Sequence, residues 1–136
     1  MGNDGSFRES ISLHSDRDVS RARVLVAQWA SQQGFSVVER TRAMTAVSEI
    51  SRNCVIHGGG GTMYVSTLYN NGSPGFRIQI VDQGPGIENL ELSMGRGYST
   101  RGGLGLGLDG ARKLCRAFRV ESNAGAGTTV TLDYWR

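Results

Sequence analysis

Hydrophobic residues recur at helical spacing in some segments of this chain and at every second position in others. Each change of spacing predicts a new helix or strand. Phe7–Leu13 shows partial alternation, diluted by Ser10 and Ser12, which predicts a first strand. Ser15–Asp18 resembles a capping box, and after it apolar residues recur at helical spacing as far as Gly34, a typical helix stop. The helical apolar positions are Val19, Ala22, Val26 and Trp29.

A second helix and a hairpin follow. Ser36–Glu39 is another capping box, and the helix that it opens ends at the glycine run Gly58–Gly61. The apolar face of this helix consists of Val47, Ile50 and Cys54. After the glycine run the period changes to two, so Met63–Tyr69 predicts a strand, Asn70–Gly75 a turn and Phe76–Val81 the antiparallel neighbour.

The last part of the chain returns from helix to strand. A glycine-rich loop runs from Asp82 to Gly107, and Leu108–Ala117 predicts a helix. Two final strands, joined by a short turn, are predicted at Phe118–Ser122 and Thr128–Tyr134. This order predicts an α+β fold, a two-layer sandwich with helices on one face of a mixed, mainly antiparallel sheet. A chain of 136 residues fits one such domain, over residues 1–136.

Composition narrows the functional classes. The chain is 38% hydrophobic and 20% charged, which is ordinary for a soluble globular protein, and no apolar segment has the length that spans a bilayer. The net charge of +3 comes from scattered basic residues, so we expect no nucleic-acid partner. Because no signal peptide is visible, we expect a cytoplasmic protein with no membrane partner. The two cysteines, Cys54 and Cys115, are expected to be buried free thiols.

Glu49 and Asn53 are the first candidate site residues. They are four residues apart on the second predicted helix, so their side chains leave the same face about one turn apart. A carboxylate beside a neutral oxygen ligand suits a hydroxyl that must be oriented or deprotonated next to Mg²⁺. By itself, such a pair is usually a solvated helix edge.

Three glycine-rich segments each offer a ligand contact, and two of them have a simpler interpretation when taken alone. Asp82–Ile87 can hold a carboxylate over a pocket that receives an exocyclic amine, although alone it is a surface turn. Gly102–Gly107 supplies free N–H groups before a helix, which suits phosphate. Gly125–Val130 places the hydroxyls of Thr128 and Thr129 beside permissive glycines, although alone it is a hairpin turn.

Two common nucleotide motifs are excluded. Gly105–Gly110 satisfies the dinucleotide pattern G-x-G-x-x-G, but no strand precedes it and too little chain follows for the parallel unit that the pattern requires. A P-loop is also absent, because the only lysine is Lys113 and no Gly-Lys-Ser/Thr occurs.

Taken in order, the candidate segments resemble the four sequence boxes of the GHKL superfamily of ATPases and kinases, which share the Bergerat fold. The matching residues are Glu49 and Asn53, then Asp82, Gly84 and Gly86, then Gly103, Gly105 and Gly107, then Gly127 and Thr128. Within the superfamily the chain is similar to the RsbT-type serine/threonine switch kinases of bacterial stress signalling. That similarity covers Ser48–Asn53, Asp82–Ile87 and Gly97–Leu108.

The resemblance implies a site for ATP and Mg²⁺. Asn53 would ligate Mg²⁺, and Glu49 would orient or deprotonate the attacking hydroxyl. Asp82 would receive the adenine amino group, supported by Thr128 or Thr129, between which the sequence does not choose. Gly84 and Gly86 would shape the adenine pocket, and the residues that cover the phosphates would be Gly103, Leu104, Gly105, Leu106 and Gly107.

The same resemblance leaves some roles and the partner open. Glu88–Gly102 would form a short ATP lid, in which Arg96 and Arg101 are either γ-phosphate partners or solvated surface residues. The expected substrate is a STAS-domain protein of a stressosome or of an anti-sigma antagonist type, in a partner-switching pathway that can include a PP2C-type phosphatase.

Two other functions remain as alternatives. Asn53 to His57 resembles the N-x-x-x-H sequence of anti-sigma-factor kinases, which also sequester a sigma factor; His57 is equally well explained as a helix C-terminal residue. The other alternative is a nucleotide-binding partner module without transfer activity, which would have no use for Glu49.

Overall fold

The computed structural model describes residues 8–84, 108–122 and 125–136, and these residues form two layers. Helices and strands follow the predicted order, so the α+β fold class is confirmed. The elements are β1 (Arg8–Leu13), α1 (Asp16–Gln32), α2 (Val37–His57), β2 (Gly61–Asn70), β3 (Ser73–Asp82), α4 (Leu108–Arg112), β4 (Ala117–Ser122) and β5 (Thr128–Trp135).

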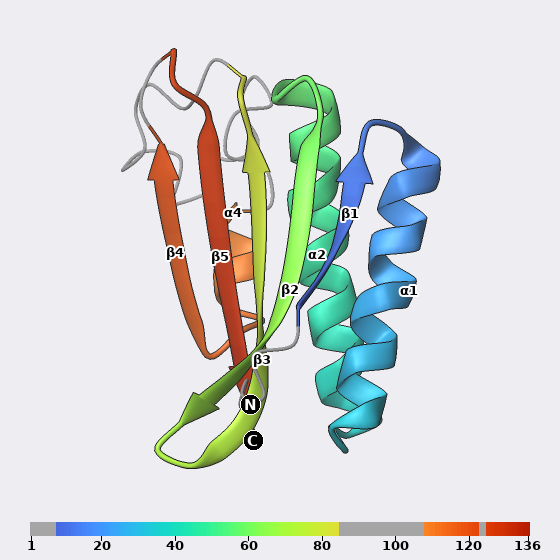
Figure 1. Ribbon diagram of the computed structural model, residues 1–136, viewed down its shortest axis with the longest axis vertical. Coiled ribbons are helices and arrows are strands. Elements are labelled where there is room, and N and C mark those ends of the chain that lie inside the picture. The colour runs from blue at the N-terminus through green and yellow to red at the C-terminus, as the bar shows by residue number, and fades with distance from the viewer. Residues whose placement is uncertain (1–7, 85–107, 123–124) are drawn as a thin grey trace.

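The sheet has the strand order β1-β2-β3-β5-β4 (Figure 1). All four pairings between the described strands are antiparallel, so the parallel component of the predicted mixed sheet does not occur among them. Directly paired residues lie on the same face, and faces alternate along a strand. The register therefore separates a covered face, which packs against the helices, from an open face.

The core lies between the covered face and the three helices of the described residues. Phe76, Ile78 and Ile80 of β3 are at most 2% exposed, and they share one buried cluster with residues of α1, α2 and α4. Figure 1 shows α2 and α4 behind the sheet. Phe76 stacks on Tyr134 with ring centroids 5.3 Å apart. Among the described residues no helix has the length and apolar character needed to cross a membrane.

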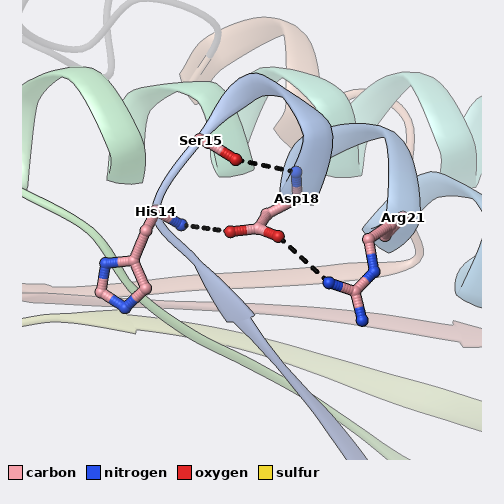
Figure 2. Close-up of polar contacts among 4 residues, drawn as sticks. All are labelled: His14, Ser15, Asp18 and Arg21. Carbon is pink, nitrogen blue, oxygen red and sulfur yellow. Dashed lines mark hydrogen bonds and ion pairs between the residues drawn. The ribbon is translucent and has the colours of Figure 1, made fainter.

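The β1–α1 junction differs from the predicted capping box in one contact (Figure 2). Ser15 is the N-cap, and its hydroxyl accepts from the Asp18 N–H at 3.4 Å. The Asp18 carboxylate reaches one residue further back than a capping box requires, accepting from the His14 N–H at 2.9 Å, and it also contacts Arg21 at 3.3 Å. These contacts lower the pKa of Asp18, chiefly through the His14 hydrogen bond.

The capping box at the start of α2 was predicted correctly, and the turn between β2 and β3 was predicted too long. The capping box of Ser36 and Glu39 is present in both directions, as predicted. The turn between β2 and β3 is shorter than predicted and consists of Asn71 and Gly72, whose φ angles are 51° and 84°. Two successive positive φ angles define the tight hairpin turn that matches strand twist, so Pro74 belongs to the beginning of β3.

The helix predicted over Leu108–Ala117 is wrong in its length, because α4 ends at Arg112. The Leu114 N–H donates to Ala111 O at 2.9 Å, a tightened last turn, and the Arg116 N–H donates to Asp133 O at 2.9 Å. Pairing with β5 therefore replaces helix before Ala117. Cys115, in this turn, is half-buried rather than buried.

Candidate functional site

A row of cross-strand partners forms the end of the sheet nearest the C-terminus of α2. Asp82 is paired with Gly61 on one side and with Thr128 on the other, and Thr128 is paired with Ser122. Asp82 lies two positions beyond the buried Ile80, so this row is on the covered face. Three strands and the end of α2 thus converge around one carboxylate.

The Asp82 side chain is held by the backbone around it. Its Oδ1 accepts from the Gly84 N–H at 2.9 Å, which orients the carboxylate and turns the chain. A Cβ on Gly58 would lie 2.6 Å from Oδ2 of Asp82, and a Cβ on Gly84 would lie 2.7 Å from the Gly58 Cα. No described residue donates a hydrogen bond to Oδ2, and a carboxylate oxygen can accept from an amine.

Two more glycines allow the strands to approach at this end. A Cβ on Gly61 would lie 2.0 Å from the Val81 carbonyl oxygen. Gly127 has a φ of 87°, and a Cβ there would lie 2.3 Å from the Asp82 carbonyl oxygen. Larger residues at either position would push the chain away from β3, so the glycines keep Asp82 close to its neighbours.

Cys54 forms the apolar side of this environment. It is 2% exposed, and a Cβ on Gly61 would lie 2.8 Å from its Sγ. Burial, together with the negative charge of Asp82, raises the pKa of the Cys54 thiol to about 12. The thiol is therefore protonated at neutral pH and contributes packing rather than nucleophilic chemistry.

The register distinguishes the two threonines between which the sequence did not choose. Thr128 is directly opposite Asp82 and lies on the covered face. Thr129 is opposite Val81 and Glu121 and lies on the open face. The Thr128 hydroxyl is 2.9 Å from the Ser122 hydroxyl, and either can be the donor. Only Thr128 shares a face with the carboxylate.

Glu49, Asn53 and His57 form a half-buried stripe along α2. Each is four residues from the next, so the stripe extends about 12 Å towards the Asp82 end of the sheet. Glu49 makes no hydrogen bond or ion pair with any described residue. The buried Ile50 and Cys54 point into the core instead, as predicted.

Several predicted site residues lie outside the described residues. Gly86, Arg96, Arg101 and the segment Gly103, Leu104, Gly105, Leu106 and Gly107 fall within 85–107. The described chain resumes at Leu108, in α4, which packs against α2. With five residues, α4 is shorter than the helix on which the predicted phosphate site relied.

The polar groups at the Asp82 end of the sheet and on α2 suit adenine and a nucleotide-bound Mg²⁺ ion. A fixed carboxylate, a hydroxyl and closely approaching glycine backbone are complementary to a flat ring that carries an amine. Asn53 and Glu49 offer oxygens one turn apart on α2, and Mg²⁺ takes few protein ligands because phosphate oxygens and waters complete its shell. Within the described residues no cluster of three or more acidic, histidine or cysteine side chains could hold a metal by itself.

Two residues of this site were not predicted. The sequence interpretation treated Gly58 only as part of a helix stop, yet Gly58 contacts both Asp82 and Gly84. Ser122 was assigned only to a strand, yet its hydroxyl contacts Thr128 and donates to Gly127 O at 3.1 Å. The adjacency of a glycine run and a helix end was a usable signal for Gly58. No local pattern marks Ser122.

Comparisons with known proteins identify the family of the chain. The family profile described as "Histidine kinase-, DNA gyrase B-, and HSP90-like ATPase" matches residues 38–136. Over 125 residues the chain is 36% identical to the serine/threonine-protein kinase RsbT of Bacillus subtilis, covering 92% of this chain and 94% of that protein. It is 32% identical to an anti-sigma F factor of Thermoanaerobacter sp. (strain X514), covering 88% and 87%.

Solved structures share the fold at low sequence identity. The RsbU and RsbW domains of a Mycobacterium tuberculosis protein match with a TM-score of 0.65 and 20% identity, over 96% of this chain and 33% of that chain. The histidine kinase domain of a blue-light activated kinase from Erythrobacter litoralis matches with a TM-score of 0.55 and 18% identity, over 88% and 59%.

Proposed function

This chain belongs to the family of histidine kinase-, DNA gyrase B- and HSP90-like ATPases, as one of its protein serine/threonine kinases, and we propose that it binds ATP with Mg²⁺ at the Asp82 end of the sheet. The observation that carries the proposal is the Asp82 carboxylate. One of its oxygens is held by the Gly84 N–H, and the carboxylate lies on the covered face against Gly58. Its other oxygen accepts the adenine amine, with the Thr128 hydroxyl opposite.

The α2 stripe supplies the groups for phosphoryl transfer. Asn53 ligates Mg²⁺, and Glu49, one turn earlier, orients the attacking hydroxyl of the protein substrate or takes its proton. Bound Mg²⁺ neutralises charge that develops on the transferring group. Glu49 is half-buried and makes no hydrogen bond or ion pair with another described residue, so its carboxylate is available to a substrate.

The protein substrate that we propose is a STAS-domain protein in a partner-switching pathway. Phosphorylation adds negative charge to a packed interface, which weakens the complex and releases the kinase for another partner such as a PP2C-type phosphatase. The similarity to RsbT over most of both chains supports this substrate class.

An anti-sigma function is the second candidate, because the chain is also 32% identical to anti-sigma F factors and His57 continues the stripe of Glu49 and Asn53. The two functions differ in one measurable property. An anti-sigma kinase holds a sigma factor in a nucleotide-dependent, stoichiometric complex, so co-purification from the source organism with ATP and Mg²⁺ present separates it from a switch kinase.

The experiment that tests the kinase proposal separates binding from transfer. Asp82→Asn should weaken ADP binding by at least about tenfold in calorimetry, because an amide presents donors to the adenine amine. Glu49→Gln should keep nucleotide affinity within about threefold yet lose most transfer of labelled γ-phosphate to a STAS-domain protein of the source organism. Glu121→Gln, which changes an exposed carboxylate on β4, is the matched control.

Two outcomes would overturn the assignment. Unchanged ADP affinity in folded Asp82→Asn protein would remove the adenine contact. Wild-type transfer by Glu49→Gln would show that Glu49 has no part in the reaction, whereas loss of transfer in Glu121→Gln would show that the assay reports general damage.

A further inference from the structure

A pocket lies at the opposite end of the sheet from Asp82. Its volume is about 350 Å³, which falls within the range of sites for small organic molecules. It lies where the start of α2, the turn after α4 and the end of β5 meet. Six residues that line this pocket, called here the basal pocket, are Phe35, Glu39, Arg42, Lys113, Arg116 and Tyr134.

The basal pocket is separate from the nucleotide site. Thr128 is the first residue of β5, and Tyr134 is one of its last, so the two sites are roughly 20 Å apart along one strand. β5 extends from the upper to the lower end of the sheet in Figure 1. A ligand in the basal pocket would therefore not compete with ATP.

Positive charge dominates the rim of the basal pocket. Three cationic side chains and one carboxylate line it: Arg42, Lys113, Arg116 and Glu39. Lys113 is paired with Asp109 at 3.4 Å, and the Arg116 Nε donates to the Trp135 carbonyl oxygen at 3.0 Å. Glu39 is engaged by the capping box, where it accepts from the N–H and the hydroxyl of Ser36, each at 3.2 Å. Among the described residues neither Arg42 nor Arg116 forms a salt bridge with a carboxylate. Guanidinium groups pair best with a carboxylate or a phosphate.

Aromatic side chains form the inner wall. Phe35 and Tyr134 are 8% and 5% exposed, and the Arg116 guanidinium lies 5.8 Å from the ring centroid of Trp135, which also lines the pocket. The Tyr134 hydroxyl has no hydrogen-bond partner among the described residues. That hydroxyl oxygen is buried, so the wall that a ligand meets is formed by the rings.

We propose that the basal pocket is a second ligand site, and that it binds a planar aromatic molecule carrying a carboxylate or a phosphate. The ring packs against the aromatic wall, and the anionic group pairs with Arg42 and Arg116. Because α2 contributes both to this pocket and to the Glu49–Asn53 stripe, a ligand here contacts the same rigid helix that carries the transfer residues.

The test uses three probes on the full chain: 2-naphthoate, phenyl phosphate and the neutral 2-naphthamide. Calorimetry or ligand-observed NMR should show saturable binding of at least one anion, at least about fivefold tighter than that of the amide. Arg42→Gln and Arg116→Gln should each weaken anion binding by at least about fivefold. Arg23→Gln, an exposed arginine on α1, should leave it unchanged.

Each further outcome decides the proposal. Comparison of the naphthoate and phenyl phosphate affinities identifies the preferred anionic group. Saturating ADP should not change the anion affinity by more than about twofold, and loss of ADP binding in Asp82→Asn should leave it intact, so this test is independent of the kinase proposal. The proposal is overturned if neither anion saturates below about 10 mM, if the Arg42 and Arg116 variants bind normally, or if ADP displaces the probe from wild type but not from Asp82→Asn protein, which would place the probe at the Asp82 site.

Discussion

Gly58 and Asp82 are in contact at the end of α2: a Cβ built on Gly58 would lie 2.5 Å from the Asp82 Cγ and 2.8 Å from its Cβ. The φ and ψ angles of Gly58 are −95° and −5°, which other residues also adopt, so the restriction is steric. Oδ1 of Asp82 is already held by Gly84, which limits how the carboxylate can move aside. The helix end and the candidate adenine contact are therefore one packed unit.

Gly58→Ala should displace Asp82 and lower the free energy of unfolding by about 1–3 kcal/mol, as overpacking does. ADP affinity should fall by at least about tenfold. Gly110→Ala is the matched control, because a Cβ there meets nothing within 4 Å. It should stabilise the protein by up to about 1 kcal/mol through a smaller backbone entropy loss. Thermal denaturation and calorimetry measure both, and a Gly58→Ala protein that matches wild type would contradict the contact.

The two threonines at the start of β5 should behave differently. Thr128→Val should weaken ADP binding by about threefold to tenfold, because it removes a hydroxyl on the Asp82 face. Thr129→Val changes the open face and should leave ADP affinity unchanged. Ser122→Ala removes the same hydrogen bond but keeps the Thr128 hydroxyl, so it should retain affinity. If Thr129→Val binds ADP more weakly than Thr128→Val, the face assignment is wrong.

Acid should weaken the β1–α1 junction through Asp18. The hydrogen bond from the His14 N–H is the main cause that lowers the pKa of Asp18 below its value of 3.8 in an unfolded chain, and the positive charge of Arg21 adds to it. Because the pKa is lower in the folded protein, the ionised Asp18 carboxylate stabilises the fold fully above pH 3.8. This stabilisation is lost as the pH falls through the pKa of the folded state. Melting temperatures of wild type and Asp18→Asn, compared between about pH 6 and pH 2.5, should converge at the acidic end. A difference that does not depend on pH would contradict this.

An ion pair on the open face should contribute to the stability of the protein. Arg77 donates to both carboxylate oxygens of Asp133, at 2.8 and 2.9 Å, and the Asp133 side chain is only 11% exposed. Arg77→Gln should therefore destabilise by about 1–3 kcal/mol, because it leaves a mostly buried carboxylate without its partner.

The double variant Arg77→Gln with Asp133→Asn should lose less stability than the two single variants together. Denaturant unfolding of the four proteins gives the coupling energy. Strict additivity would show that the pair contributes nothing beyond its separate side chains.

Much of the fold was predictable because it depends on near neighbours. Ser36 and Glu39 are three residues apart, and their reciprocal contacts form as soon as the helix starts. The alternation in Met63–Tyr69 defines a strand face without reference to the rest of the chain. The predicted helix up to Ala117 was too long, because a hydrogen bond to β5 replaces the helical pattern before that residue. The predicted capping box at Ser15 was also incomplete, because the Asp18 carboxylate accepts from the N–H of His14 instead of that of Ser15.

The sequence by itself determined the order of the elements, their buried faces and the positions of Glu49, Asn53 and Asp82 as candidates, because periodicity and caps are local. Only the tertiary structure decided that Thr128 rather than Thr129 faces Asp82, since a shift of one residue in register reverses every side chain of a strand. It also brought Gly58 against Asp82 and joined Phe35, Arg116 and Tyr134 around the basal pocket. These residues are far apart in the chain, and no local period relates them.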